Sequence, residues 1–299
     1  MKLNIFSTFL FFVTIFALLS CGGENEQAVV ENETAKKALS EEYDSKENKP
    51  QQIFYSLPSP FELASMLRNS GASFNKDILN SPENISNYST SSVKAFNLGV
   101  YGADLSYASI YSQTQNSMEF LNCVKKLSDD LGISAAFDPK SMERMEANKG
   151  NDDSLQQIVS EGYLIANSFL KQNDREDLST FVLAGGFLEG VYIATQLIKT
   201  DSENEELLMM IADQKFAIEN LVALLEKYDD TSVADMKKDF NELNTLFSEL
   251  EINIGEQEFK IDAKNNTTVI GGGDRTMISD EQLLTITTKV ESIRNKYVS

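Results

Sequence analysis

Two acidic residues are each followed, three positions later, by a tyrosine. These pairs are Asp104 with Tyr107 and Glu189 with Tyr192. Residues three apart on a helix lie on the same face, so each pair would present a carboxyl and a phenol together. Glu189 is the only charged residue in the stretch 181–198. A carboxylate in such apolar surroundings must be paired, hydrogen-bonded or protonated, because an isolated buried charge is very costly.

Two hypotheses follow for these residues, and the sequence leaves both open. The first makes Glu189 a structural acid, held by one of several partners: tyrosine hydroxyls, Asn97, Gln196 or an arginine such as Arg144. The second makes the two pairs a ligand-binding site, in which the carboxyls face a cation or an amine. The candidate ligand-binding residues are then Asp104, Tyr107, Glu189 and Tyr192.

Both pairs lie in glycine-containing stretches that predict closely packed helices. Gly99, Gly102, Ala103 and Ser106 line one side of the first helix, and Gly186 and Gly190 are four apart in the second. Glycine inside a helix costs up to about 1 kcal/mol relative to alanine, and close backbone packing is the natural compensation. The second stretch is apolar enough to suggest a membrane span, but its glycines and central acid favour a buried bundle helix. The repeated spacing suggests a duplicated helical-hairpin unit.

Start and stop signals predict an all-α bundle of about eight to nine helices over residues 53–299. A small hairpin or loop is predicted near 256–273, where β-branched residues alternate. In the first half of the chain, the predicted helices run from Pro60 to Gly71, from Pro82, and from Ser91 or Ser92 through Tyr111 and past a bend to Leu131. The next three are predicted from Asp138-Pro139 to Gly150, from Asp152 or Asp153 to about Asn173, and from Asp174 to about Lys199. The last three cover Ser202–Tyr228, Ser232–Ile254 and the residues from the capping box Ser279–Gln282 onward.

The composition excludes several classes of function. The chain has no histidine, so it cannot carry Ser-His-Asp or Cys-His catalysis or an imidazole zinc site. Its 46 acidic and 26 basic residues argue against nucleic-acid binding, which relies on Lys and Arg. Cys123 lies in an apolar helical stretch and is predicted to be a buried, inert thiol. We predict no catalytic residues, no metal ligands and no cofactor.

The first residues have the pattern of a bacterial lipoprotein signal peptide. Lys2 precedes an apolar run, which ends in Leu18-Leu19-Ser20-Cys21. A small residue directly before a cysteine is what lipoprotein processing requires, and the run is short for a membrane span of roughly 20 residues. We therefore expect residues 1–20 to be removed and Cys21 to carry the lipid that anchors the protein. The polar segment 21–52 is expected to be a disordered, acidic tether.

Four stretches resemble a family of uncharacterised helical lipoproteins of Bacteroidetes: Pro58–Leu63, Asn75–Asn80, Asn97–Tyr111 and Gly185–Leu197. The resemblance covers most of residues 55–230. It implies export and a helical fold, and it brings no activity, cofactor or catalytic residue to this chain. Glu24 and Glu26, soon after Cys21, partly resemble the signal that sends lipoproteins of that phylum to the cell surface.

These observations predict an exported, outer-membrane-anchored lipoprotein that binds another envelope protein. The periplasmic or surface face stays open. This version predicts an exposed apolar groove, for example between Ser202–Tyr228 and Ser232–Ile254. The alternative is a small-ligand or cation-binding protein, which predicts a closed polar pocket near Asp104 and Glu189. An enzyme that uses only carboxylates and tyrosines is a third, weaker hypothesis.

Overall fold

The structure is a computed structural model that describes residues 57–134, 143–144, 147–148, 151–228, 231–251, 258–262, 267–271 and 278–299. All described residues belong to one unit of the chain, Pro50–Ser299. The predicted signal peptide 1–20, the lipidated Cys21 and the tether that ends at residue 52 lie outside the described residues. Most of the helix predicted from Asp138-Pro139 to Gly150 lies outside them as well.

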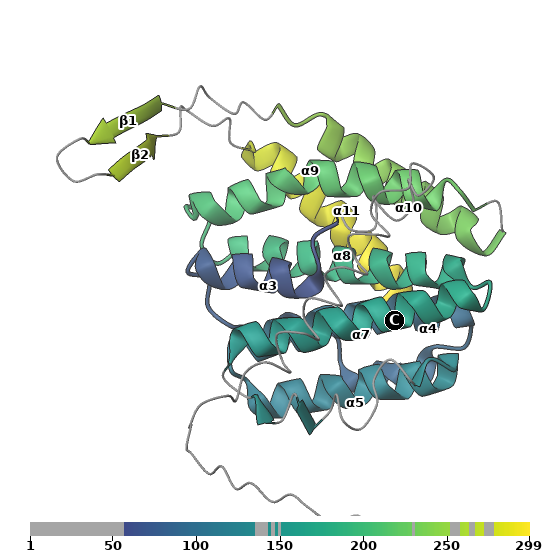
Figure 1. Cartoon of the computed structure of the whole chain (residues 1–299). Coiled ribbons are helices and arrows are strands. Elements are labelled where there is room, and N and C mark those ends of the chain that lie inside the picture. The colour runs from purple at the N-terminus through teal and green to yellow at the C-terminus, as the bar shows by residue number, and fades with distance from the viewer. Residues whose placement is uncertain are drawn as a thin grey trace, which may run out of the picture. The chain divides into compact units, whose positions relative to one another are not determined.

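The described fold is an all-α bundle, as the sequence predicts (Figure 1). Its α-helices are α3 (Pro60–Asn69), α4 (Ser91–Ile110), α5 (Thr114–Leu131), α7 (Asp152–Gln172), α8 (Glu176–Ile198), α9 (Glu205–Leu225), α10 (Thr231–Ser248) and α11 (Asp280–Val298). Two short 3₁₀ helices, η1 (Lys76–Ile78) and η2 (Pro82–Asn87), lie between α3 and α4. Between α10 and α11, the strands β1 (Glu258–Asp262) and β2 (Thr267–Gly271) form an antiparallel hairpin, in which Phe259 pairs with Ile270.

The capping signals at the two ends of the bundle are confirmed. The Ser59 side chain accepts the N–H of Glu62, and the Glu62 carboxylate accepts the N–H of Ser59, which completes a capping box on α3. Ser279 and Gln282 do the same on α11. Gly132 ends α5 with the left-handed φ of 71° that a helix C-terminus often needs.

Helix α4 begins at Ser91, as predicted, and Thr90 caps it. Other helices differ from the prediction. Helix α9 begins at Glu205 rather than at Ser202, and α10 ends at Ser248 rather than at Ile254. Asp174 does not cap α8, because it adopts a left-handed φ of 54° and α8 begins at Glu176. The helix predicted from Pro82 is the 3₁₀ helix η2. The bend predicted after Tyr111 is present, since Ser112 has a φ of 56° and separates α4 from α5.

Helices α4 and α8 form the centre of the bundle, and other helices cover them. Helix α5 packs on α4, helices α3 and α7 contact both central helices, and α9 and α11 pack on α8, with α10 beyond them (Figure 1). Helix α8 is also long and apolar enough to cross a membrane, judged by length and composition alone. In the protein, 83% of the most apolar 18-residue stretch of α8 is buried inside the bundle. This burial agrees with the prediction of a core helix.

The close packing predicted from glycine is present between α4 and α8, but its residues are only partly those expected. A Cβ atom on Gly99 would lie 2.0 Å from the carbonyl oxygen of Val182, and one on Gly185 would lie 1.9 Å from that of Phe96. The two backbones therefore touch, and only glycine fits at these points. Gly190 faces α3 instead, where its Cβ would lie 2.6 Å from Cδ1 of Leu63.

Candidate functional site

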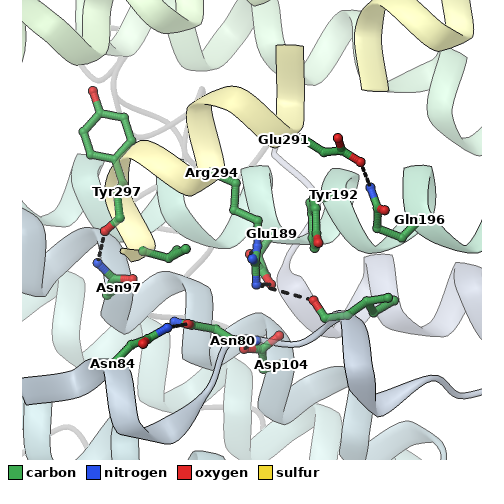
Figure 2. A network of polar contacts seen from close by, with 12 residues as sticks. Asn80, Asn84, Asn97, Asp104, Glu189, Tyr192, Gln196, Glu291, Arg294 and Tyr297 are labelled. Carbon is green, nitrogen blue, oxygen red and sulfur yellow. Dashed lines mark hydrogen bonds and ion pairs between the residues drawn. The ribbon is translucent and has the colours of Figure 1, made fainter. Parts of the chain in front are cut away.

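Glu189 and Arg294 form a buried ion pair between α8 and α11 (Figure 2). The Nε and Nη2 atoms of Arg294 donate to the two carboxylate oxygens of Glu189 at 2.7 and 2.8 Å. Glu189 is fully buried and Arg294 is 7% exposed. Paired N–H groups on a planar carboxylate make one of the stronger hydrogen-bonded contacts in proteins. Glu189 is therefore an ionised acid whose counter-ion comes from the chain itself.

Two further contacts hold the Arg294 guanidinium. Its Cζ lies 4.1 Å from the ring centroid of Tyr192, a cation–π contact with the residue three positions after Glu189. Its Nη2 also donates to the carbonyl oxygen of Ile78, at the end of η1, at 3.4 Å. Burial by itself lowers the pKa of Arg294, but the charge of Glu189 and its hydrogen bonds raise that pKa above its ordinary value. The guanidinium is therefore charged.

Asp104, on α4, completes the cluster as an un-ionised acid. Its Oδ2 accepts the backbone N–H of Asn80 at 3.2 Å, and its buried Oδ1 receives no donor. Burial, followed by the negative charge of Glu189, raises the pKa of Asp104 well above its ordinary value. The Glu189 carboxyl raises the pKa of Asp104 further as a side-chain neighbour, so the proton of the cluster belongs to Asp104. The cluster of acid, carboxylate and guanidinium is thus neutral overall.

The C-terminal end of α11 is capped by side chains of the same region. The Nδ2 of Asn97 donates to the carbonyl oxygen of Tyr297 at 2.7 Å, and the hydroxyl of Tyr88 donates to that of Val298 at 3.3 Å. The last carbonyls of a helix have no partner within the helix, so these bonds satisfy two of them. Figure 2 shows Asn97 reaching from α4 to Tyr297 beside the ion pair.

Three of the four predicted ligand-binding residues therefore meet. Asp104 and Glu189 face each other across the α4–α8 interface, and Tyr192 covers the arginine. The cation that these carboxyls were expected to face is present, but it is the side chain of Arg294. The contacts of Glu189 are therefore those of a structural acid that is held by a partner within the chain, as in the first hypothesis.

Tyr107, the fourth residue, makes other contacts. Its hydroxyl accepts the backbone N–H of Asn75 at 3.0 Å and donates to the carbonyl oxygen of Ser73 at 3.3 Å. Its ring stacks on Phe74 with a centroid distance of 5.0 Å. The expectation that Tyr107 joins Asp104 in one polar site is wrong, because the phenol ends on the 73–75 segment. Tyr107 fixes that segment before η1.

The partners proposed for Glu189 bind elsewhere. Arg144 pairs with Glu161 at 2.7 Å, and Gln196 donates to Glu291 at 2.8 Å. Asn97 donates to backbone carbonyls of α4 and α11.

The sequence does contain a signal for Arg294, the partner that sequence reasoning missed. On the buried face of α11, Ile286, Val290, Arg294 and Val298 follow each other at every fourth position, so the arginine interrupts an apolar stripe. Such a position requires a buried acid opposite it, since an arginine is rarely buried unless it is paired.

The cluster is closed, and the described cavity lies elsewhere. Asp104 and Glu189 are fully buried. Asp104 is neutral, and the negative charge of Glu189 is balanced by the positive charge of Arg294. A cavity of about 180 Å³ lies between the end of α10 and the start of α11, lined by Leu246, Glu249, Glu281, Gln282, Thr285 and Ile286. The pocket expected from the ligand hypothesis is therefore filled by the protein's own guanidinium.

The apolar faces of α9 and α10, expected to frame a groove, pack together and are buried. Leu221 and Leu225 of α9 and Phe240 and Phe247 of α10 belong to the core. Phe216 of α9, at 56% exposure, is the large apolar side chain that these two helices leave at the surface among their described residues.

Within the described part of the chain, no group of three or more carboxyl or thiol side chains is placed to hold a metal ion. No protein-family model, no curated protein and no solved structure matches this chain.

Proposed function

We propose that the protein is an exported lipoprotein, anchored in the outer membrane by a lipid on Cys21, and that its helical unit is a binding module for another envelope protein. The observation that carries this proposal is the Leu18-Leu19-Ser20-Cys21 ending of a short apolar leader. Two or more acyl chains on one cysteine anchor a protein stably, whereas a single chain binds only marginally. The polar segment after Cys21 then acts as a spacer between the lipid and the bundle.

The geometry of the buried cluster supports a binding role over a catalytic one. Asp104 and Glu189 are the acids that sequence reasoning singles out for chemistry, and both are fully buried. Their partner Arg294 is internal, so these groups hold helices together and do not face a substrate. Recognition would then take place on the outer surface of the bundle, and the net charge of −20 of the whole chain favours basic partners.

Lipid attachment is tested by labelling with radioactive palmitate in a host that makes lipoproteins. We expect the wild-type protein and Cys123→Ser to incorporate the label and to fractionate with membranes. Cys21→Ser should lose the label and leave the membrane fraction. Cys123 is the matched control because it is the chain's only other cysteine. Label retained in Cys21→Ser would overturn the proposed anchor, and protease treatment of intact cells would report which face carries the bundle.

The binding role is tested separately from the anchor. A photo-reactive amino acid at Phe216, whose side chain is 56% exposed, is expected to cross-link to one discrete envelope protein in intact cells, and the same substitution at the buried Phe240 is the control. Purified protein should show no rise in thermal stability with divalent cations or amines. A reproducible rise in the wild-type protein with any of these ligands would favour the ligand-binding alternative instead.

A further inference from the structure

The buried cluster joins three helices through one ionisable side chain from each. Asp104 comes from α4, Glu189 from α8 and Arg294 from α11 (Figure 2). The two acids are fully buried, and the single guanidinium binds both oxygens of Glu189. A second negative charge in this interior would have no further cation to balance it. Electroneutrality therefore requires Asp104 to keep its proton while the three helices remain docked.

We propose that the proton on Asp104 locks α11 onto α4 and α8, and that its loss releases α11 from the bundle. With its proton, Asp104 adds no second negative charge beside the Glu189 carboxylate, both of whose oxygens are already bound by Arg294. Without this proton, two carboxylates face each other in a dry interface. The un-ionised state therefore belongs to the closed bundle.

The other titratable groups that feel the charge of Asp104 cannot replace that proton. Burial raises the pKa of Cys123, on α5, to about 11, and burial also raises the pKa values of Tyr101, on α4, and Tyr192, on α8. These groups are neutral near neutral pH and can only add negative charge when they ionise. Asn80 contributes one backbone N–H to the Asp104 carboxyl. Ionisation of Asp104 must therefore be met by water, which needs a helix to move.

Helix α11 is the element that can move, since α4 and α8 are in backbone contact at Gly99 and Gly185. By contrast, α11 is held through side chains. Its buried face, with Ile286 and Val290, packs into the core, and near its end side-chain bonds come from Asn97 and Tyr88. Lys296 of α11 also pairs with Asp239 at 2.7 Å. Separation of α11 would open the Asp104 carboxyl to water and leave the α4–α8 contact intact.

The linkage is tested with the mature full-length protein and its Asp104→Asn variant, whose amide cannot ionise. A carboxyl with a raised pKa in the folded state makes unfolding easier as the pH rises, from the ordinary carboxyl pKa up to the raised one. The unfolding constant of the wild type, relative to that of the variant at the same pH, should rise up to about tenfold per pH unit across this window. A ratio that stays constant from pH 4 to pH 9 would overturn the proposal.

Hydrogen–deuterium exchange locates the change. Across the pH range in which the ratio rises, the protection of α11 amides should fall progressively in the wild type and stay constant in Asp104→Asn, while amides of α4 and α8 stay protected in both. Loss of protection in all three helices together, or none in α11, would contradict release. If Asp104→Asn does not fold, infrared spectroscopy of the wild type decides instead. A carboxylic-acid C=O band in the folded protein at pH 7, absent after unfolding, is expected, and its absence would overturn the proposal.

Discussion

Arg294 binds both carboxylate oxygens of Glu189 across a separation of 105 residues. The pair joins the central helix α8 to the last helix of the chain, and Tyr192 and Asp104 enclose it. Because the counter-ion of Glu189 comes from α11, the stability of the bundle depends on that helix. The ion pair is therefore the natural place to perturb the fold.

Glu189→Gln should destabilise the protein strongly, because it leaves the Arg294 guanidinium buried without a counter-ion. Removal of one partner of a buried ion pair costs about 3–5 kcal/mol. Urea unfolding followed by circular dichroism would measure the loss. An effect below about 1 kcal/mol would mean that Glu189 is un-ionised and that Arg294 does not depend on it.

The matched comparison removes both charges at once. In the double variant Glu189→Leu with Arg294→Met, no unpaired charge remains, so we expect a smaller loss than in Glu189→Gln alone. Lys94→Met is the surface control, since Lys94 pairs with Asp130 at 2.9 Å with both side chains partly exposed. Its loss should stay within about 1 kcal/mol. A double variant less stable than Glu189→Gln would contradict this account.

Gly185→Ala should be destabilising, because the added Cβ would lie 1.9 Å from the backbone oxygen of Phe96. Neither backbone can move aside alone, so α4 and α8 must separate, which we expect to cost about 3 kcal/mol. Gly190→Ala is the control, because its new Cβ would meet only the flexible end of Leu63. Thermal unfolding should rank Gly185→Ala well below Gly190→Ala, and equal effects would contradict backbone contact as the cause.

Cys123 should be unreactive in the folded protein. Its side chain is buried, and burial raises its pKa to about 11, so almost no thiolate exists at pH 8. A thiol reagent should label no cysteine of the lipidated native protein and one after unfolding in urea. The rate should increase only as the pH approaches 11. Rapid labelling at pH 8 would show that α4 and α5 open readily around it.

Tyr107→Phe tests the role that the structure gives to this tyrosine. The substitution removes the hydrogen bonds to Asn75 and Ser73 and keeps the stacked ring. We expect a loss of about 1–2 kcal/mol, together with faster amide exchange in the segment before η1. Exchange in α11 should not change. Altered protection of α11 would mean that Tyr107 supports the buried cluster after all.

The parts of the fold that follow from local chemistry could be predicted from the sequence. The capping boxes at Ser59 and Ser279 mark the starts of α3 and α11. Each box consists of hydrogen bonds between residues only three apart, so it does not depend on the rest of the fold. The all-α class and the buried position of α8 follow from periodicity and apolar content. Glycine content indicated a close helix pair, although the register that places Gly185 against α4 depends on the partner helix.

The long-range contacts could not be predicted in the same way. The apolar stripe of α11 marks Arg294 as a buried arginine, but the acid that it meets depends on which helix packs on α11, and nothing local to Glu189 encodes that. The length of the Tyr107 side chain decides that its hydroxyl reaches Ser73 and Asn75, while Asp104 on the same helix face stays near Glu189. The proposed duplication of a hairpin unit, which equates Tyr107 with Tyr192, stays a prediction.

The position of Arg294 also decides which fragments of the chain can keep a closed bundle. Glu189 and Arg294 are 105 residues apart, so a cut anywhere between α8 and α11 separates a buried carboxylate from its counter-ion. The piece that contains α4 and α8 could keep their glycine contact only with that charge unbalanced. Proteolysis between α8 and α11 should therefore open the bundle.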